Sequence, residues 1–156
     1  NVLSNEKSKT FLLNFNHPVL ELIFVVQNKK VKNKLPEKGN DWLNFSKTLT
    51  YPFKDPVKSA KIILNGQDRT PEFTSKELKF YNLFEKHTGI PNNFIYLYSF
   101  SLKPEEYQPT GSCNFSRFDN KQLQLEFEDN IEHSELKIYA LNYNILRLSK
   151  GLAGLA

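Results

Sequence analysis

The sequence predicts an all-β protein, a single antiparallel β-sandwich with one short helix and long loops. Thirteen Phe and seven Tyr stand against only six Gly, and aromatic side chains favour pleated, half-buried surfaces. Several segments repeat apolar residues with the period of two that strands require. A length of 156 residues with 39% hydrophobic content suffices for one core, so we expect residues 1–156 to form one domain.

Two strands are expected near the N-terminus, joined by a turn at His17–Pro18. The first has aromatic and aliphatic residues at every second position: Phe11, Leu13 and Phe15. The second, Val19–Val26, is largely apolar on both faces and is interrupted only by Glu21. A strand that is apolar on both faces is typical of the interior of a sandwich, so we expect a central strand here.

A long exposed loop and a hairpin are expected next. Residues 27–56 are polar and contain prolines, which favours a loop, although the part around 42–53 is expected to pack back. Apolar residues then alternate up to Asn65–Gly66, the dipeptide that most readily forms a type I′ turn. One helix should follow over about residues 75–87, because Thr74 and Glu77 have capping-box spacing and Gly89 and Pro91 end the pattern.

The clearest strands lie in the C-terminal half. Alternation is strict from Phe94 to Leu102 and again from Leu123 to Phe127. A last apolar stretch, Leu136–Leu148, predicts at least one long strand, which gives six to eight strands in all. Residues 150–156 are interpreted either as a small-residue tail that lies against a neighbouring surface or as a frayed terminus.

No residue pattern typical of an enzyme is present. His17, His87 and His133 lie in separate segments without metal-binding spacing, so each is interpreted as a turn or surface residue. Cys113, the only cysteine, is interpreted as a small packing residue and cannot form an intrachain disulfide. The paired acids Glu105–Glu106 and Glu126–Glu128 look solvated, and glycine-rich phosphate-binding motifs are absent. We therefore expect no catalytic site, metal or cofactor.

Charge and hydropathy argue against several partners. The net charge of +4 is small and interspersed, which does not predict a specific nucleic-acid surface. The lysine cluster of residues 29–38 could contact a polyanion, but it lacks interleaved aromatic residues and a solvated loop is favoured. Apolar stretches are too short to span a membrane. Asn44 and Asn114 begin N-x-S patterns that are expected to be unused, although glycans stay possible.

Three segments resemble the major capsid proteins of nucleocytoplasmic large DNA viruses. Residues 13–27 look like the strand pair that opens the second of the two jelly rolls in that family. Residues 98–120 resemble its most specific motif, a strand followed by a Pro/Gly loop and an Asn-Phe-Ser-Arg core, with Phe118 where the family often has Ile. Residues 139–156 look like its closing strand and Gly/Ala tail, and His87–Pro91 adds a shorter match.

The resemblance implies a jelly-roll topology and a structural role. The chain would be the C-terminal jelly roll of a subunit of an icosahedral viral capsid, and three copies would assemble into a homotrimeric capsomer of pseudo-hexagonal outline. Its partners would be itself, neighbouring capsomers and minor capsid proteins. It would be a late protein of the virion, assembled in the host cytoplasm. The chain contains no Met, so we interpret it as a segment that lacks the first jelly roll.

The resemblance also singles out a structural and assembly motif: Pro104, Pro109, Gly111, Asn114, Phe115, Ser116, Arg117 and Asp119. The prolines and the glycine would fix the path of the loop, while Arg117 and Asp119 could pair across a buried or interfacial turn. Two other classes stay open. A carbohydrate-binding jelly roll for host attachment would use rings in the predicted loops, at Trp42, Tyr51 and Tyr107, and a jelly-roll enzyme would require bound metal.

Overall fold

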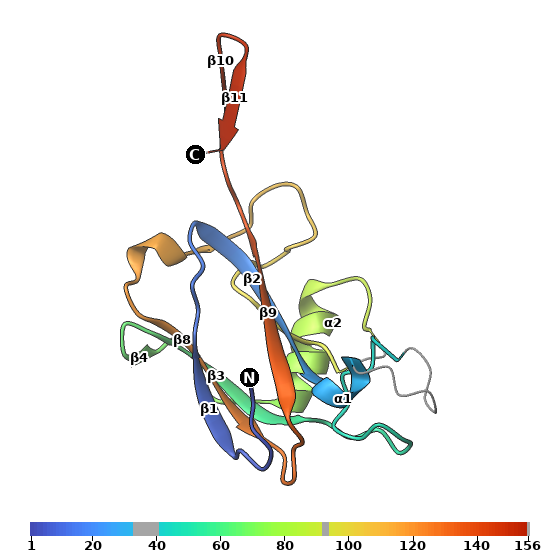
Figure 1. Cartoon of the computed structure of the whole chain (residues 1–156). Coiled ribbons are helices and arrows are strands. Elements are labelled where there is room, and N and C mark those ends of the chain that lie inside the picture. The colour runs from blue at the N-terminus through green and yellow to red at the C-terminus, as the bar shows by residue number, and fades with distance from the viewer. Residues whose placement is uncertain (33–40, 92–93, 156) are drawn as a thin grey trace.

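The computed structural model describes residues 1–32, 41–91 and 94–155, which form a two-layer sandwich with a helix at one side (Figure 1). One sheet has the order β1 (Ser8–Leu12), β8 (Lys121–Phe127), β3 (Val57–Leu64) and β4 (Gln67–Asp68), with β5 (Phe73–Thr74) also paired to β3. The other sheet is built on β2 (Pro18–Asn28), which pairs with β6 (Tyr96–Ser99), β7 (Cys113–Asn114) and β9 (Ser134–Asn142). Every pairing is antiparallel, and the predicted jelly-roll sandwich is confirmed.

The hydrophobic core lies between the two sheets. Alternate side chains of β2, at Leu22, Phe24 and Val26, point inward and are almost fully buried. The ring of Phe24 stacks on Tyr96 of β6, with centroids 5.2 Å apart. From the opposite sheet, β8 contributes the residues whose alternation predicted that strand: Leu123, Leu125 and Phe127.

The strand β2 is central, as its double-sided apolar pattern predicted. It pairs with β9 along most of its length on one side and with β6 and β7 on the other. Its second face is covered too, because Glu21 and Gln27 are both buried there. The side-chain amide of Gln27 donates to the Trp42 carbonyl at 2.7 Å, so the segment that begins at residue 41 does pack back on the sheet.

The hairpin turn and the helix start are also confirmed. Asn65 and Gly66 have φ values of 49° and 78°, as a type I′ turn requires, and Leu64 pairs with Gln67 across it. The Thr74 amide and hydroxyl both donate to the Glu77 carboxylate, at 2.7 and 2.8 Å, in the predicted capping box. Helical residues run from 75 to 86, through a π-helical segment η1 (Glu77–Tyr81) and then α2 (Asn82–Lys86).

Two predicted strand and loop boundaries are wrong. The strand expected from Phe94 to Leu102 pairs only over β6, because the Phe100 and Ser101 amides both donate to the Leu20 carbonyl. These two residues face a single residue of β2 and so form a β-bulge, which ends the ladder of hydrogen bonds between β6 and β2. The expected loop after residue 27 begins with a short helix α1 (Lys29–Lys32), while Lys34 and Lys38 of the predicted lysine cluster lie outside the described residues.

The C-terminal prediction also needs correction. The stretch expected as one long strand divides after β9, and the chain continues into a separate hairpin of β10 (Leu146–Ser149) and β11 (Leu152–Leu155). The frayed end considered for residues 150–156 is wrong, since most of those residues form β11, whereas packing of this segment against a neighbouring surface stays a prediction. The cause is the Lys150–Gly151 turn, where both residues have positive φ, at 48° and 79°.

Candidate assembly site

Residues 103–119, here called the assembly loop, begin with a tip of residues 103–110 that one threonine closes. The Thr110 hydroxyl lies 2.6 Å from the Ser101 hydroxyl, accepts from the Lys103 amide at 2.9 Å and donates to the Lys103 carbonyl at 3.1 Å. Ser101 is itself buried at the end of the sheet. The two ends of the tip are therefore fixed to each other and to the sandwich.

The residues predicted to fix the path of this loop lie at both ends of the tip. Pro104 is buried at its start, whereas Pro109 is exposed just before Thr110. Gly111 follows with φ of 127°, a conformation that strains any residue with a Cβ. A Cβ there would also lie 3.4 Å from the Phe100 carbonyl oxygen. Between the two prolines lies Tyr107, whose ring is fully exposed.

The Asn-Phe-Ser motif anchors the far end of the assembly loop. Asn114 caps the 3-10 turn η2 (Phe115–Arg117), because its side-chain oxygen accepts from the Ser116 amide at 3.1 Å. Phe115 is completely buried and meets the ring of Phe100 edge-on at 5.6 Å. The Ser116 hydroxyl accepts from the His17 amide at 2.9 Å. These three residues hold the turn against the start of β2.

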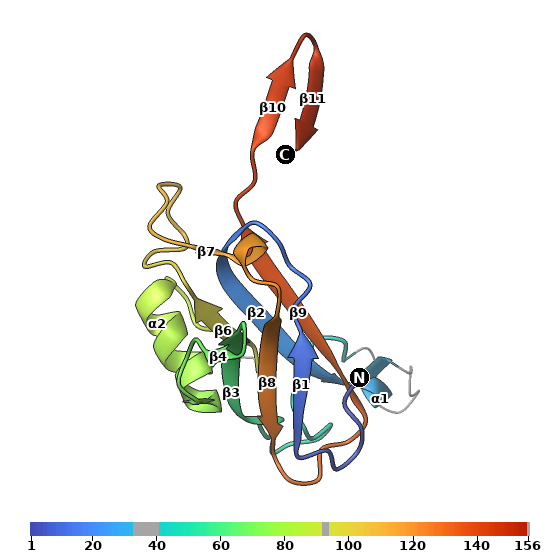
Figure 2. The same ribbon diagram turned by 90° about the vertical axis from the view of Figure 1, so that its left-hand side faces the viewer.

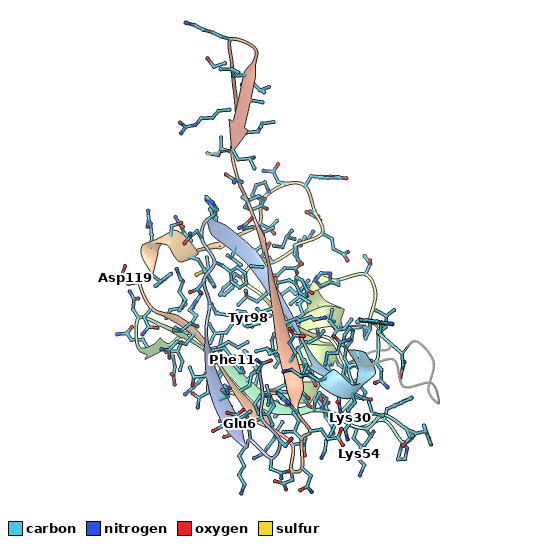
Figure 3. All side chains as sticks on the ribbon, viewed as in Figure 1. Glu6, Phe11, Lys30, Lys54, Tyr98 and Asp119 are labelled. Atoms are coloured by element: carbon cyan, nitrogen blue, oxygen red, sulfur yellow. The ribbon has the colours of Figure 1, made fainter. Side chains whose placement is uncertain are left out.

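Arg117 and Asp119 differ from that group because their side chains are exposed and have no bonding partner among the described residues. In the described part of the chain, no hydrogen bond or ion pair joins them, so the intramolecular pairing suggested by the sequence is not formed. The Asp119 backbone is fixed instead, since its amide donates to the Asn65 side chain at 3.1 Å. Figure 3 places Asp119 at the edge of the molecule, on the opposite side from Lys30 and Lys54. The anchored turn thus presents two opposite charges at the surface.

His87 ties the assembly loop to the central strand, a connection that sequence reasoning missed. Its Nε2 lies 2.9 Å from a carboxylate oxygen of Glu21 on β2, and its Nδ1 lies 3.1 Å from Glu105 in the loop. His87 lies at the end of α2, in keeping with the predicted turn or surface position, but its imidazole side chain is only 16% exposed and is held on both sides. Glu105 also accepts from the Thr88 amide at 3.2 Å. We call Glu21, His87, Thr88 and Glu105 the His87 clasp.

The clasp changes the titration of the loop carboxylate. The hydrogen bond from the Thr88 amide holds the pKa of Glu105 below its ordinary value. Desolvation of the carboxylate opposes this shift, and the contact with His87 adds to it. Glu105 was expected to be simply solvated, but it is hydrogen-bonded to two residues after the helix end. Its partner Glu106 forms only an exposed ion pair with Lys103, at 2.9 Å.

The other residues considered from the sequence do not form a site. Within the described ranges, no three His, Cys, Asp or Glu side chains lie close enough to hold a metal ion. Cys113 is half-buried against the core, as predicted for a packing residue, and burial raises the pKa of its thiol. Trp42, Tyr51 and Tyr107 are exposed, but no ring contact joins any two of them in the part of the chain that the structure describes. No helix there is long and apolar enough to cross a membrane.

Comparison with known proteins gives a consistent picture. Residues 2–154 match the family model described as large eukaryotic DNA virus major capsid protein. The chain is 33% identical to the major capsid protein of Pyramimonas orientalis virus over 172 aligned positions, which cover 96% of this chain and 39% of that protein. It is 44% identical to the major capsid protein of Chrysochromulina ericina virus over 110 positions, which cover 66% of this chain and 18% of that protein.

A solved structure agrees over the whole chain. The structure titled "PBCV-1 virus capsid, quasi-atomic model" superposes with a TM-score of 0.80 at 29% sequence identity. The match covers all of this chain and 48% of that one. This chain therefore spans less than half the length of the proteins named here.

Proposed function

Because the chain belongs to the family of large eukaryotic DNA virus major capsid proteins, we propose that it is a structural subunit of an icosahedral capsid and assembles as a homotrimeric, pseudo-hexagonal capsomer. Its relatives are named as capsid proteins, in agreement with the expectation that it is not an enzyme. Its place is the virion shell, beside other capsomers and minor capsid proteins. Assembly takes place in the host cytoplasm, late in infection.

The chain is further proposed to be the second of two jelly rolls in a subunit. Its 48% share of the PBCV-1 capsid chain leaves room in a protein of that size for a second module as large. Two similar sandwiches side by side would give each subunit two of the six corners of the outline. Three subunits then complete the ring with closed symmetry.

The proposal rests on one observation, which is that the assembly loop is rigid at its base and charged at its surface. Phe115 is buried and Ser116 is bonded to His17, so the following turn cannot shift without disturbing the core. The backbone at Arg117 and Asp119 is held by that turn, and both side chains are exposed. A backbone that is already ordered loses little further entropy when its charged side chains pair with a neighbour, which suits repeated contacts between identical subunits.

Replacing Arg117 with Ala in the complete gene product tests this role. We expect trimer yield, measured by sedimentation velocity, to fall while the melting temperature of the dissociated subunit stays unchanged. Lys54→Ala is the matched control, since this residue is also exposed and cationic but lies on the opposite side (Figure 3). A wild-type protein that stays monomeric would contradict the trimer, and an Arg117→Ala variant that assembles normally would contradict the role of the loop.

A further inference from the structure

The C-terminal hairpin stands away from the sandwich. Figures 1 and 2, which differ by a quarter turn, both show β10 and β11 extending beyond the end of the sheets. Every residue of the two strands is exposed. An isolated two-stranded hairpin is at best marginally stable in water, so this one needs a surface to pack against.

The two faces of the hairpin have different chemistry. Leu146 pairs with Leu155 and Leu148 with Ala153, and these two neighbouring pairs share one side because strand side chains alternate. That side, here called the apolar face, has no polar side chain. The opposite side is more polar, because it consists of two polar residues, one glycine and one leucine: Arg147, Ser149, Gly154 and Leu152. One face is thus suited to burial and the other to solvent.

A complementary groove lies on the flank of the sandwich, between β1 and β9. It has a volume of about 350 Å³ and is lined by two polar residues, Asn1 and Asn14, and by six apolar ones: Phe11, Leu12, Leu13, Phe15, Leu136 and Ile138. Among the described strands, β1 pairs only with β8 and β9 only with β2, and the outer edge of β9 is bridged by Val2 only at Ser134. The rest of both edges is open at this groove. Leu12 is 68% exposed at its mouth. We call this site the β1/β9 groove.

The hairpin is held away from the groove of its own chain. The Tyr143 amide donates to the Pro18 carbonyl at 2.9 Å, and the Asn142 side chain donates to the Asn16 carbonyl at 3.2 Å. Both bonds lie where the chain leaves β9, and beyond them the hairpin points outward (Figure 2). In this structure the apolar face is exposed beyond the end of the sandwich, and no residue of the hairpin lines the groove. An apolar arm and a partly apolar groove that lie apart in one chain can meet between two.

We propose that the apolar face of the hairpin packs into the β1/β9 groove of a second copy of this chain. This inference rests on the proposed homotrimer, in which identical copies lie side by side. The contact joins two different surfaces, so it is heterologous, and repeating it around an axis closes a ring. Leucine side chains would fill the groove, while Arg147 on the other face stays in solvent.

Two glutamate substitutions test the two halves of the contact in the complete gene product. Leu148→Glu on the apolar face and Leu12→Glu in the groove should each weaken trimer formation about tenfold or more, by sedimentation velocity. Leu152→Glu is the matched control, because it alters an equally exposed leucine on the other face of the same hairpin. It should leave assembly unchanged, and far-ultraviolet circular dichroism would verify that every variant folds.

Disulfide trapping identifies the occupant of the groove. Subunits with Leu12→Cys and subunits with Leu148→Cys, both also containing Cys113→Ser, are mixed and mildly oxidised, and a covalent heterodimer is the expected product. A third variant contains both Leu12→Cys and Leu148→Cys in one chain. If a disulfide forms only within this chain and never between two chains, the hairpin packs into the groove of its own subunit. If no crosslink forms and the glutamate variants trimerise normally, the hairpin packs elsewhere, for instance on another module of the same polypeptide, and this inference fails. A wild-type monomer would instead refute the trimer itself.

Discussion

The Nε2 atom of His87 lies 2.9 Å from the Oε2 atom of Glu21, whose residue is only 4% exposed. A buried carboxyl group without a partner is costly, so the imidazole supplies a hydrogen-bond partner for Glu21 on the central strand. The other ring nitrogen contacts Glu105 in the assembly loop, at 3.1 Å. One side chain therefore joins the core of the sandwich to the loop proposed to make contacts.

Replacing His87 with Ala should reduce the free energy of unfolding by about 1 to 3 kcal/mol, because Glu21 would lose its partner while staying buried. Urea unfolding followed by fluorescence measures the change. His133→Ala is the control, since that residue is exposed and should change stability by less than about 0.5 kcal/mol. Equal stability of the two variants would show that the clasp contributes nothing.

The pKa of Glu105 is depressed by the Thr88 amide, and this predicts a pH dependence. A carboxyl group with a lowered folded-state pKa stabilises the fold above its ordinary, unfolded pKa. That contribution is lost as the pH falls through the folded-state pKa. Glu105→Gln should therefore melt at a lower temperature than the wild type near neutral pH, and the two curves should converge in acid. If the melting temperatures of the two proteins differed by the same amount at every pH, the bond between Thr88 and Glu105 would not be the cause of the difference.

Gly111→Ala should destabilise the protein by about 1 to 3 kcal/mol, since alanine would be strained at a φ of 127°. The added Cβ would also press on the Phe100 carbonyl. Gly89→Ala provides the comparison, because its φ is unstrained and a Cβ added there would have no atom within 4 Å. Thermal melting of both variants decides the matter, and a stable Gly111→Ala protein would mean that the loop relaxes freely.

Phe115→Ala should cost about 3 to 5 kcal/mol, as expected when a fully buried aromatic ring leaves a cavity. Phe84→Ala removes the same ring from an exposed position on α2 and should change stability by less than about 0.5 kcal/mol. Chemical denaturation measures both. A small effect at Phe115 would show that the turn before Arg117 is not anchored in the core.

Local patterns predicted the elements that depend on neighbouring residues. The alternation at Leu123, Leu125 and Phe127 indicated β8, and the Asn65–Gly66 dipeptide indicated the type I′ turn, because each is determined by the adjacent chain. The same holds for the Thr74 capping box. The fold class was predictable for this reason.

Features that depend on distant residues were not predictable. The contact of His87 with Glu21 joins residues that lie 66 positions apart, and no spacing in the sequence relates the two. The bulge that ends β6 depends on the Leu20 carbonyl of another strand. The C-terminal hairpin was missed for a different reason: Lys150–Gly151 between two short apolar segments could have indicated a turn, but the alternation before it suggested one continuous strand.

The Thr110 hydroxyl closes the tip of the assembly loop, with consequences for how such a protein can diverge. Changes of length or composition around Tyr107 end at this closure, provided that Glu105 keeps its bonds to His87 and Thr88. The entropy of a longer tip grows only slowly with its length. The segment around Tyr107 is therefore a place where related proteins can acquire new outer shapes, or where a foreign peptide can be displayed, without redesign of the sandwich.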